Sequence, residues 1–171
     1  MKTNKVAVLP YDEKWKNAFE EIKQEIFNCS RDLIESIEHV GSTSIEGMSA
    51  KPCIDIDVVI KDYSVFEKLK DRLASIGYIY EGDLGIKDRE AFRYINKEHL
   101  MMHHLYVCPS YSEELKRHIE FRNYLRHNPE AVKRYSSVKE KGAKLYLNDI
   151  DKYIEYKTPI IEELYRECGL L

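Results

Sequence analysis

The fold of this chain is decided by one stretch, Glu38-His-Val-Gly-Ser-Thr-Ser-Ile-Glu-Gly-Met-Ser-Ala-Lys-Pro-Cys-Ile-Asp-Ile-Asp-Val58. Residues 34–40 are expected to form a strand that leads into a small polar turn, Gly41-Ser-Thr-Ser44. A proline then precedes the best strand of the sequence, residues 53–60, in which apolar side chains alternate with Asp55 and Asp57. Because successive side chains of a strand point to opposite faces, the two carboxylates share one face.

The paired carboxylates have two interpretations. Residues two apart on a strand lie roughly 6.6 Å apart along the chain, and two like charges on one face of an apolar strand are costly. A divalent cation such as Mg²⁺ would remove that cost, because it binds carboxylates and completes its shell with water and phosphate oxygens. An edge strand with one solvated face would show the same alternation without any ion. The spacing alone does not choose between the two.

The glycine-serine turn favours the metal and phosphate interpretation. Gly41 permits close backbone approach. A turn that follows a strand and opens a helix offers free N–H groups and the Ser42 hydroxyl to a phosphate. The alternative is an ordinary helix-capping turn, and a lone Gly-Ser pair is weak evidence. Gly-Ser followed thirteen residues later by Asp-x-Asp in a strand is a much less common pattern.

Outward from this stretch, the rest of the chain predicts an α+β fold. Residues 12–27 carry apolar side chains at helical spacing, with Trp15, Phe19, Ile22 and Ile26 on the buried face. Three further short strands are predicted, at residues 78–80, 91–95 and 102–108. Downstream, Ser112 is expected to cap one helix, and Asn128 and Pro129 are expected to start another. The prediction is a single domain over residues 1–171, with an α/β core at 1–110 and a helical part at 111–171 packed on it.

The stretch quoted above resembles the signature of the GrpB-like family. That family is similar in fold to nucleotidyltransferases of the DNA polymerase β type, and it also resembles a domain fused to some dephospho-CoA kinases. The resemblance covers roughly residues 9 to 160. Its other motifs are Tyr11-x-x-x-Trp15, His103-His-Leu-Tyr-Val107, Phe121-Arg-Asn-Tyr-Leu-Arg-His-Asn-Pro129, Tyr135-x-x-x-Lys139 and Tyr153-x-x-x-Lys157. The resemblance implies a mixed sheet flanked by helices, with a helical C-terminal third.

The resemblance also implies roles for the residues of the quoted stretch. Gly41 and Ser42 match the motif that holds a triphosphate, and Asp55 and Asp57 match the first two metal-binding carboxylates. The superfamily's third carboxylate is missing from residues 102–108, which offer His103 and His104 instead. We expect His104 to complete the site as a metal ligand or general base. The expected ion is Mg²⁺ or Mn²⁺, with Zn²⁺ a weaker candidate, although an imidazole suits Mg²⁺ poorly.

Four cationic side chains are candidates for phosphate binding. Lys51 would pair with phosphate or simply neutralise the two aspartates. Arg122, Lys139 and Lys157 belong to family motifs, and a guanidinium binds phosphate in bidentate fashion. Residues 115–145 contain nine Lys/Arg against three Glu. A solvated helical surface would show the same excess, and specific nucleic-acid binding is not expected from it.

Composition limits the class of protein. The 171 residues carry a net charge of −3, and the four cysteines form no CxxC pair. No apolar run approaches the roughly 20 residues needed to cross a bilayer, so we expect a cytoplasmic protein without membrane contact.

The sequence predicts a nucleotidyltransferase-like protein that binds a nucleoside triphosphate with divalent metal and transfers a nucleotidyl group to an unknown acceptor. The alternative is a non-catalytic module that binds a nucleotide or CoA-like ligand and assists a partner enzyme.

Overall fold

A computed structural model describes residues 5–171 of the chain. Its helices are α1 (Lys14–Ser30), α2 (Phe66–Ser75), α3 (Glu113–Arg126), α4 (Pro129–Leu145) and α5 (Ile150–Glu167). Its strands are β1 (Ser36–Val40), β2 (Ile54–Ile60), β3 (Tyr78–Gly82), β4 (Glu90–Tyr94) and β5 (His103–Pro109). Two short 3₁₀ turns are η1 (Ser42–Ser44) and η2 (Tyr63–Val65). The predicted α+β class is confirmed.

The strands form one mixed sheet in the order β1-β2-β5-β4-β3. Strands β2 and β5 run parallel, and the other neighbours are antiparallel. The strand that carries the aspartates therefore lies inside the sheet, so the edge-strand interpretation of the alternation is wrong. In the β2–β5 register Asp55 is opposite His104, and Asp57 is opposite Tyr106.

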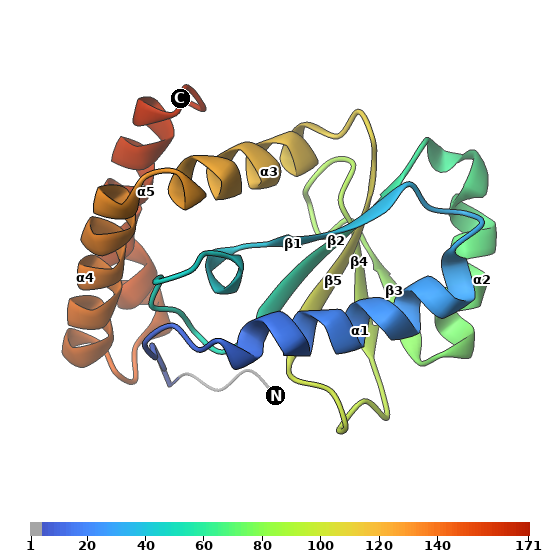
Figure 1. The fold of residues 1–171 in the computed structure, drawn as a ribbon, viewed down its shortest axis with the longest axis horizontal. Coiled ribbons are helices and arrows are strands. Elements are labelled where there is room, and N and C mark those ends of the chain that lie inside the picture. The colour runs from blue at the N-terminus through green and yellow to red at the C-terminus, as the bar shows by residue number, and fades with distance from the viewer. Residues whose placement is uncertain (1–4) are drawn as a thin grey trace.

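Helices α1 and α3 lie on opposite sides of the sheet, and α4 and α5 stand beside one end of it (Figure 1). The four apolar residues predicted for the first helix are all buried in the main core, together with the inner face of α2. This core places the aspartates on the other face of β2, because side chains alternate along the strand. That face looks toward α3.

The helical third packs on the segment that follows the Gly-Ser turn. Ile45 and Met48 of that segment are almost completely buried. They form a second apolar cluster with residues of α3, α4 and α5, chiefly Leu125, Ala131, Val132, Tyr135, Ile160 and Leu164. The last three helices thus fix the position of the turn relative to the sheet.

The predicted helix starts are partly confirmed. Ser112 caps α3, since its hydroxyl accepts from the Leu115 N–H at 3.1 Å. Pro129 begins α4 as expected, but the Asn128 side chain donates to the Tyr124 carbonyl at 2.6 Å instead of capping the new helix. None of the described helices has both the length and the apolar character needed to cross a membrane.

Candidate functional site

The conformation of Gly41 explains why the turn begins with glycine. Its backbone has φ 75° and ψ −178°, a region that is essentially restricted to glycine. A Cβ at this position would also overlap Oδ2 of Asp55. The backbone of Gly41 therefore lies directly against the first carboxylate of β2.

The turn does not open an α-helix as predicted. Ser42–Ser44 form a single 3₁₀ turn that is followed by extended chain at Ile45, so a helix dipole is not available to a ligand here. The turn is braced from within, because the Ser44 hydroxyl donates to the Gly41 carbonyl at 2.5 Å. It is also held from the helical third, where Arg126 Nε donates to the Ser44 carbonyl at 3.1 Å.

The two aspartates have different surroundings. The side chain of Asp57 is completely buried, whereas that of Asp55 is 34% exposed. Burial raises the pKa of the Asp57 carboxyl. Its Oδ2 atom lies 2.6 Å from His118 Nδ1, and its Oδ1 atom has no hydrogen-bond partner among the described residues. Asp55 Oδ1 lies 3.0 Å from His104 Nδ1.

Residue His118 was not predicted from the sequence. Its Nε2 atom lies 3.1 Å from Glu114 Oε1, so carboxylate oxygens face both ring nitrogens. Burial works against the charged imidazole, but the contact with Asp57 outweighs it and raises the pKa of His118. The Glu114–His118 spacing on one helix face is the signal that the sequence offered. The sequence did not reveal that His118 reaches Asp57 on β2.

The consecutive histidines of β5 divide as the strand alternation predicted. His104 faces Asp55, and hydrogen bonding to that carboxylate raises its pKa. His103 points into the core on the other face. There its Nε2 atom contacts the Tyr78 hydroxyl at 2.8 Å, and its Nδ1 atom contacts the Met101 carbonyl at 2.8 Å. His103 is therefore a structural residue.

Residue His39 is also structural. Its Nε2 atom lies 3.0 Å from the Thr43 hydroxyl, and its ring stacks on Phe19 with 4.5 Å between centroids. Burial lowers the pKa of His39 to about 4. The neutral ring thus links β1, the turn and α1.

Among the predicted phosphate-binding cations, Lys139 contacts the turn directly. Its Nζ atom donates to the Ser42 hydroxyl at 2.6 Å and to the Ser49 carbonyl at 2.8 Å, and it lies 4.1 Å from the centroid of the Tyr135 ring. Burial lowers the pKa of Lys139 well below its usual value, and nearby Lys157 adds to the effect. Burial likewise lowers the pKa of Lys157.

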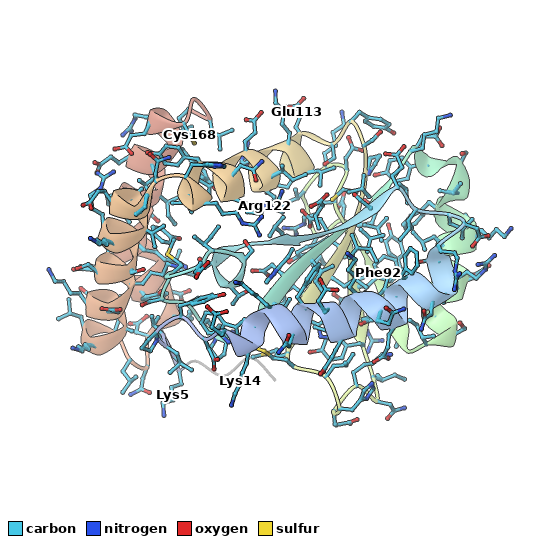
Figure 2. All side chains as sticks on the ribbon, viewed as in Figure 1. Lys5, Lys14, Phe92, Glu113, Arg122 and Cys168 are labelled. Atoms are coloured by element: carbon cyan, nitrogen blue, oxygen red, sulfur yellow. The ribbon has the colours of Figure 1, made fainter. Side chains whose placement is uncertain are left out.

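Arg122 lies between α3 and β1 (Figure 2) and is held by protein groups. Its Nη1 atom donates to Glu38 Oε2 at 2.9 Å and to the His39 carbonyl at 3.1 Å. Its Nε atom donates to Asn123 Oδ1 at 3.2 Å, so the predicted phosphate contact of Arg122 would have to use Nη2. Other basic residues of α3 and α4 are also paired with glutamates, as Arg134 is with Glu163 and Glu167. The local positive excess of residues 115–145 is therefore partly balanced in the folded chain.

Two cavities meet at the turn. The larger, about 580 Å³, is lined by three of the predicted cations, Lys51, Lys139 and Lys157. The smaller, about 220 Å³, is lined by α3 residues that include His118 and Arg122. Both cavities are lined by Ser42, Asp55 and Tyr135. Asp55 therefore stands at the boundary between a cationic cavity and one that contains an imidazole and arginines.

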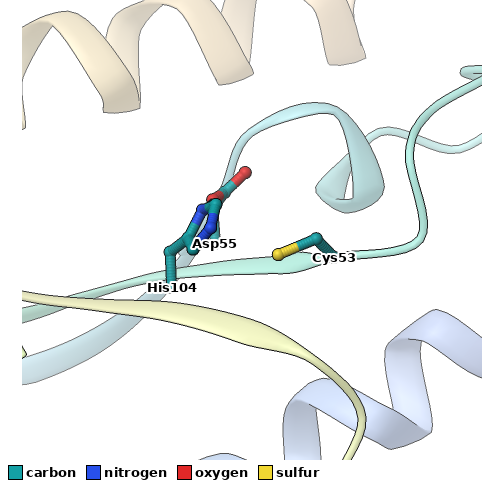
Figure 3. A group of neighbouring side chains, drawn as sticks. All are labelled: Cys53, Asp55 and His104. Carbon is teal, nitrogen blue, oxygen red and sulfur yellow. The ribbon is translucent and has the colours of Figure 1, made fainter. Parts of the chain in front are cut away.

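One group of possible metal ligands occurs among the described residues, and it differs from the predicted one. Ligand atoms of Cys53, Asp55 and His104 all lie within 4.8 Å of one another (Figure 3). Asp57 stands outside this group, and His118 engages its Oδ2 atom. Asp55 and His104 lie together, as the sequence predicted. Cys53 was not among the predicted ligands.

The order of these motifs, the sheet and the turn can be compared with known proteins. The profile of the family described as GrpB protein matches residues 5–167. The chain belongs to the GrpB family. This confirms the resemblance found in the sequence.

Relatives of this GrpB family member differ in length. The glutamate-rich protein GrpB of Alkalihalophilus pseudofirmus is 32% identical over 165 residues, which cover 95% of this chain and 95% of that protein. The UPF0157 protein YqkA of Bacillus subtilis is 31% identical over 158 residues, 92% of this chain but 46% of that protein. The chain thus spans about half the length of YqkA. A dephospho-CoA kinase of Mycolicibacterium paratuberculosis is 23% identical, covering 95% of this chain and 46% of that protein.

Two crystal structures show the same fold. Conserved protein GrpB from Enterococcus faecalis superposes with a TM-score of 0.82 at 31% identity, over 95% of this chain and 96% of that chain. The Cid1 poly(U) polymerase with MgGTP bound gives a TM-score of 0.54 at 10% identity, over 80% of this chain and 44% of that chain. At that identity the likeness concerns the fold alone. The predicted nucleotidyltransferase-like fold of this GrpB family member is confirmed.

Proposed function

We propose that this chain binds a nucleoside triphosphate together with a divalent cation at the Gly41–Ser42 turn and Asp55. The observation that carries the proposal is the contact between Gly41 and Asp55 at the boundary of two cavities. Because Gly41 has no side chain, the turn lies beside this carboxylate, where the Ser42 hydroxyl and an ion on Asp55 would contact the same phosphate. The Cid1 structure with MgGTP bound has the same fold, which supports looking for a nucleotide here.

The larger cavity suits the triphosphate. Its volume of about 580 Å³ falls in the range of small-molecule sites, roughly 300–1,000 Å³. Lys51, Lys139 and Lys157 line it and can neutralise phosphate charge. Lys139 is already bonded to Ser42, so the cation and the hydroxyl would contact the same phosphate. An anion in the cavity would also stabilise the charged forms of Lys139 and Lys157, whose pKa values burial lowers.

The aspartates fit a divalent cation by ligand type. Mg²⁺ or Mn²⁺ would use carboxylate oxygens, and the buried Oδ1 atom of Asp57 has no hydrogen-bond partner within residues 5–171. When bound, such an ion would neutralise the two carboxylates and the transferred phosphate. The rings of His104 and His118 lie beside the carboxylates in the present structure, and these contacts raise the pKa of both histidines. We propose that both histidines adjust when the ion binds, with His104 remaining near Asp55.

The smaller cavity is the proposed place for an acceptor. An acceptor hydroxyl there would form a bond to the α-phosphorus while the bond to pyrophosphate breaks. Asp55 lines both cavities, and we propose that it takes the acceptor proton. Arg122 would orient an acceptor through Nη2, because Nη1 and Nε donate to protein oxygens. The acceptor itself belongs to a chemical class that has a nucleophilic oxygen and fits about 220 Å³, or that enters this cavity with one end.

A specific observation favours the second candidate, a binding module without turnover. Strand β5 places His104 and Tyr106 beside Asp55 and Asp57, so no carboxylate occupies the neighbouring positions on that strand. His118 engages the buried Asp57. In this form the site would hold a nucleotide or a CoA-like ligand and serve a partner enzyme in the cytoplasm. The relative that is a dephospho-CoA kinase supports a CoA-like ligand as the alternative.

One experiment separates these candidates. The protein is incubated with each of ATP, CTP, GTP and UTP, with Mg²⁺ or Mn²⁺, in the presence of water alone, a polyol mixture or RNA. Ligand-induced thermal stabilisation and pyrophosphate release are both measured, and the Asp55→Asn variant is the control. Stabilisation with pyrophosphate release supports transfer, and stabilisation alone supports the module. Absence of both, or stabilisation that is unchanged in the variant, overturns the nucleotide site.

A further inference from the structure

Three different ligand types meet on the α3-facing side of the sheet. Cys53 and Asp55 are two residues apart in an extended chain, so their side chains point the same way. His104 is opposite Asp55 on the parallel neighbour β5. A thiol sulfur, a carboxylate oxygen and an imidazole nitrogen therefore come within 4.8 Å of one another. Figure 3 shows the three side chains on their strands.

We propose that Cys53, Asp55 and His104 bind a Zn²⁺-like ion with one open coordination position. Thiolate and imidazole ligands favour Zn²⁺ or Co²⁺, whereas Mg²⁺ prefers oxygen ligands only. In a tetrahedral site with Zn–O and Zn–N bonds near 2.0 Å and a Zn–S bond near 2.3 Å, ligand atoms lie about 3.3 to 3.6 Å apart. The observed 3.0 Å between His104 Nδ1 and Asp55 Oδ1 would open slightly, and the sulfur, which lies within 4.8 Å of a ligand atom of each residue, would move to the same spacing.

The surroundings hold two of these ligands in place. Gly41 lies against the second oxygen of Asp55 and limits the rotation of the carboxylate. Cys53 is 5% exposed, and its backbone carbonyl accepts from the Thr43 hydroxyl at 3.5 Å. Asp55 and His104 lie on paired strands and Cys53 immediately precedes β2, so little order is lost on binding. The thiol proton and the proton between His104 and Asp55 would be released as the ion binds.

The open coordination position would face the larger cavity, which suits an anionic ligand. All three residues line the 580 Å³ cavity that also contains Lys51, Lys139 and Lys157. Three protein ligands and one free position are typical of zinc sites that bind substrate or water. We infer that the fourth ligand is water in the free protein and an oxygen of a phosphate or carboxylate when the cavity is filled.

This site shares Asp55 with the proposed nucleotide site but does not require that a nucleotide binds. It also selects a different ion from the oxygen-only pair of Asp55 and Asp57. The competing interpretation is a hydrogen-bonded His104–Asp55 pair beside an inert buried thiol. The two interpretations differ in whether sulfur contacts an added metal, which absorption spectroscopy measures directly.

The test is a titration of the reduced, full-length, nucleotide-free protein with Co²⁺. We expect one Co²⁺ per chain and a thiolate-to-Co²⁺ charge-transfer band in the near ultraviolet, both abolished by competing Zn²⁺. The Cys53→Ser variant should lose the band, and His104→Asn should weaken Co²⁺ binding by more than about 100-fold, more than the loss of a supporting outer residue. Cys168→Ser is the matched control, because this partly buried thiol is far along the chain in α5's C-cap, and it should keep the band.

The results that overturn the inference are equally specific. Co²⁺ binding without the band, or a band that persists in Cys53→Ser, shows that sulfur is not a ligand, and so does absence of Co²⁺ binding by the folded wild-type protein. If Cys53→Ser fails to fold, the His104→Asn titration decides. A cobalt band without any nucleotide-dependent stabilisation would reject the proposed function alone, and nucleotide binding with Mg²⁺ but no band would reject this inference alone.

Discussion

Replacing Gly41 with alanine is expected to destabilise the protein in two separable ways. The backbone at φ 75° and ψ −178° costs a non-glycine residue on the order of 1–3 kcal/mol. The new Cβ would also overlap Oδ2 of Asp55 and rotate the carboxylate away from His104, at about 0.5–1 kcal/mol for a half-exposed contact. The sum is roughly 1.5–4 kcal/mol. For a chain of this size that lowers Tm by about 5 to 12 °C.

Urea unfolding followed by circular dichroism measures this loss. Gly85→Ala is the matched control, because Gly85 has φ 85° but nothing within 4 Å of an added Cβ, so it should lose only the backbone part, about 1–2 kcal/mol. A double-mutant cycle isolates the overlap. In an Asp55→Ala background, the cost of Gly41→Ala should fall by about 0.5–1 kcal/mol. An unchanged cost in that background would refute the claimed contact between the turn and the carboxylate.

Three other substitutions test the surroundings of the site. Burial lowers the pKa of His39 to about 4. The free energy of unfolding of wild type should therefore fall by about 2 kcal/mol on account of this residue as the pH falls from about 7 to about 5, through the ordinary histidine pKa near 6.5. His39→Gln should lack that loss in pH-dependent urea unfolding, and parallel pH curves for the two proteins would contradict the prediction. Lys139→Met should stay within about 1 kcal/mol of wild-type stability, because an apolar chain of similar length replaces a buried charge. The same variant should lose the nucleotide-dependent thermal stabilisation, which the control Lys144→Met, at an exposed position of the same helix, should retain. Tyr78→Phe removes the buried hydroxyl bonded to His103 and should cost about 1–3 kcal/mol in urea unfolding, whereas Tyr111→Phe, 57% exposed, should cost nothing measurable.

Local patterns predicted the elements of this fold well. The helical spacing of Trp15, Phe19, Ile22 and Ile26 located α1, and the alternation around Asp55 and Asp57 located β2 and the face that carries them. Strand order was not available from the same patterns, because it depends on pairing between distant segments. The edge-strand interpretation was wrong for this reason, because β1 and β5 pair with the two edges of β2.

The candidate site shows the same limit. The sequence indicated Gly41, Asp55 and His104, and the structure brings them together because β5 pairs in parallel register with β2. It did not indicate His118, which is 61 residues from Asp57 along the chain. The partner of Arg122 was also hidden, since Glu38 lies 84 residues away. Contacts between a helix and a strand depend on how the layers pack, and no local period of either element records them.

The most direct test of the central claim is the affinity for a nucleoside triphosphate measured by titration calorimetry with and without Mg²⁺ or Mn²⁺. We expect saturable binding of one nucleotide per chain. The affinity should weaken by at least about tenfold when the ion is omitted, and again in Asp55→Asn. Asp71→Asn, on the exposed face of α2, should bind as wild type does. About tenfold corresponds to 1.4 kcal/mol. Binding that is equal in Asp55→Asn and wild type, or no binding of any of the four nucleotides with either ion, would contradict the account.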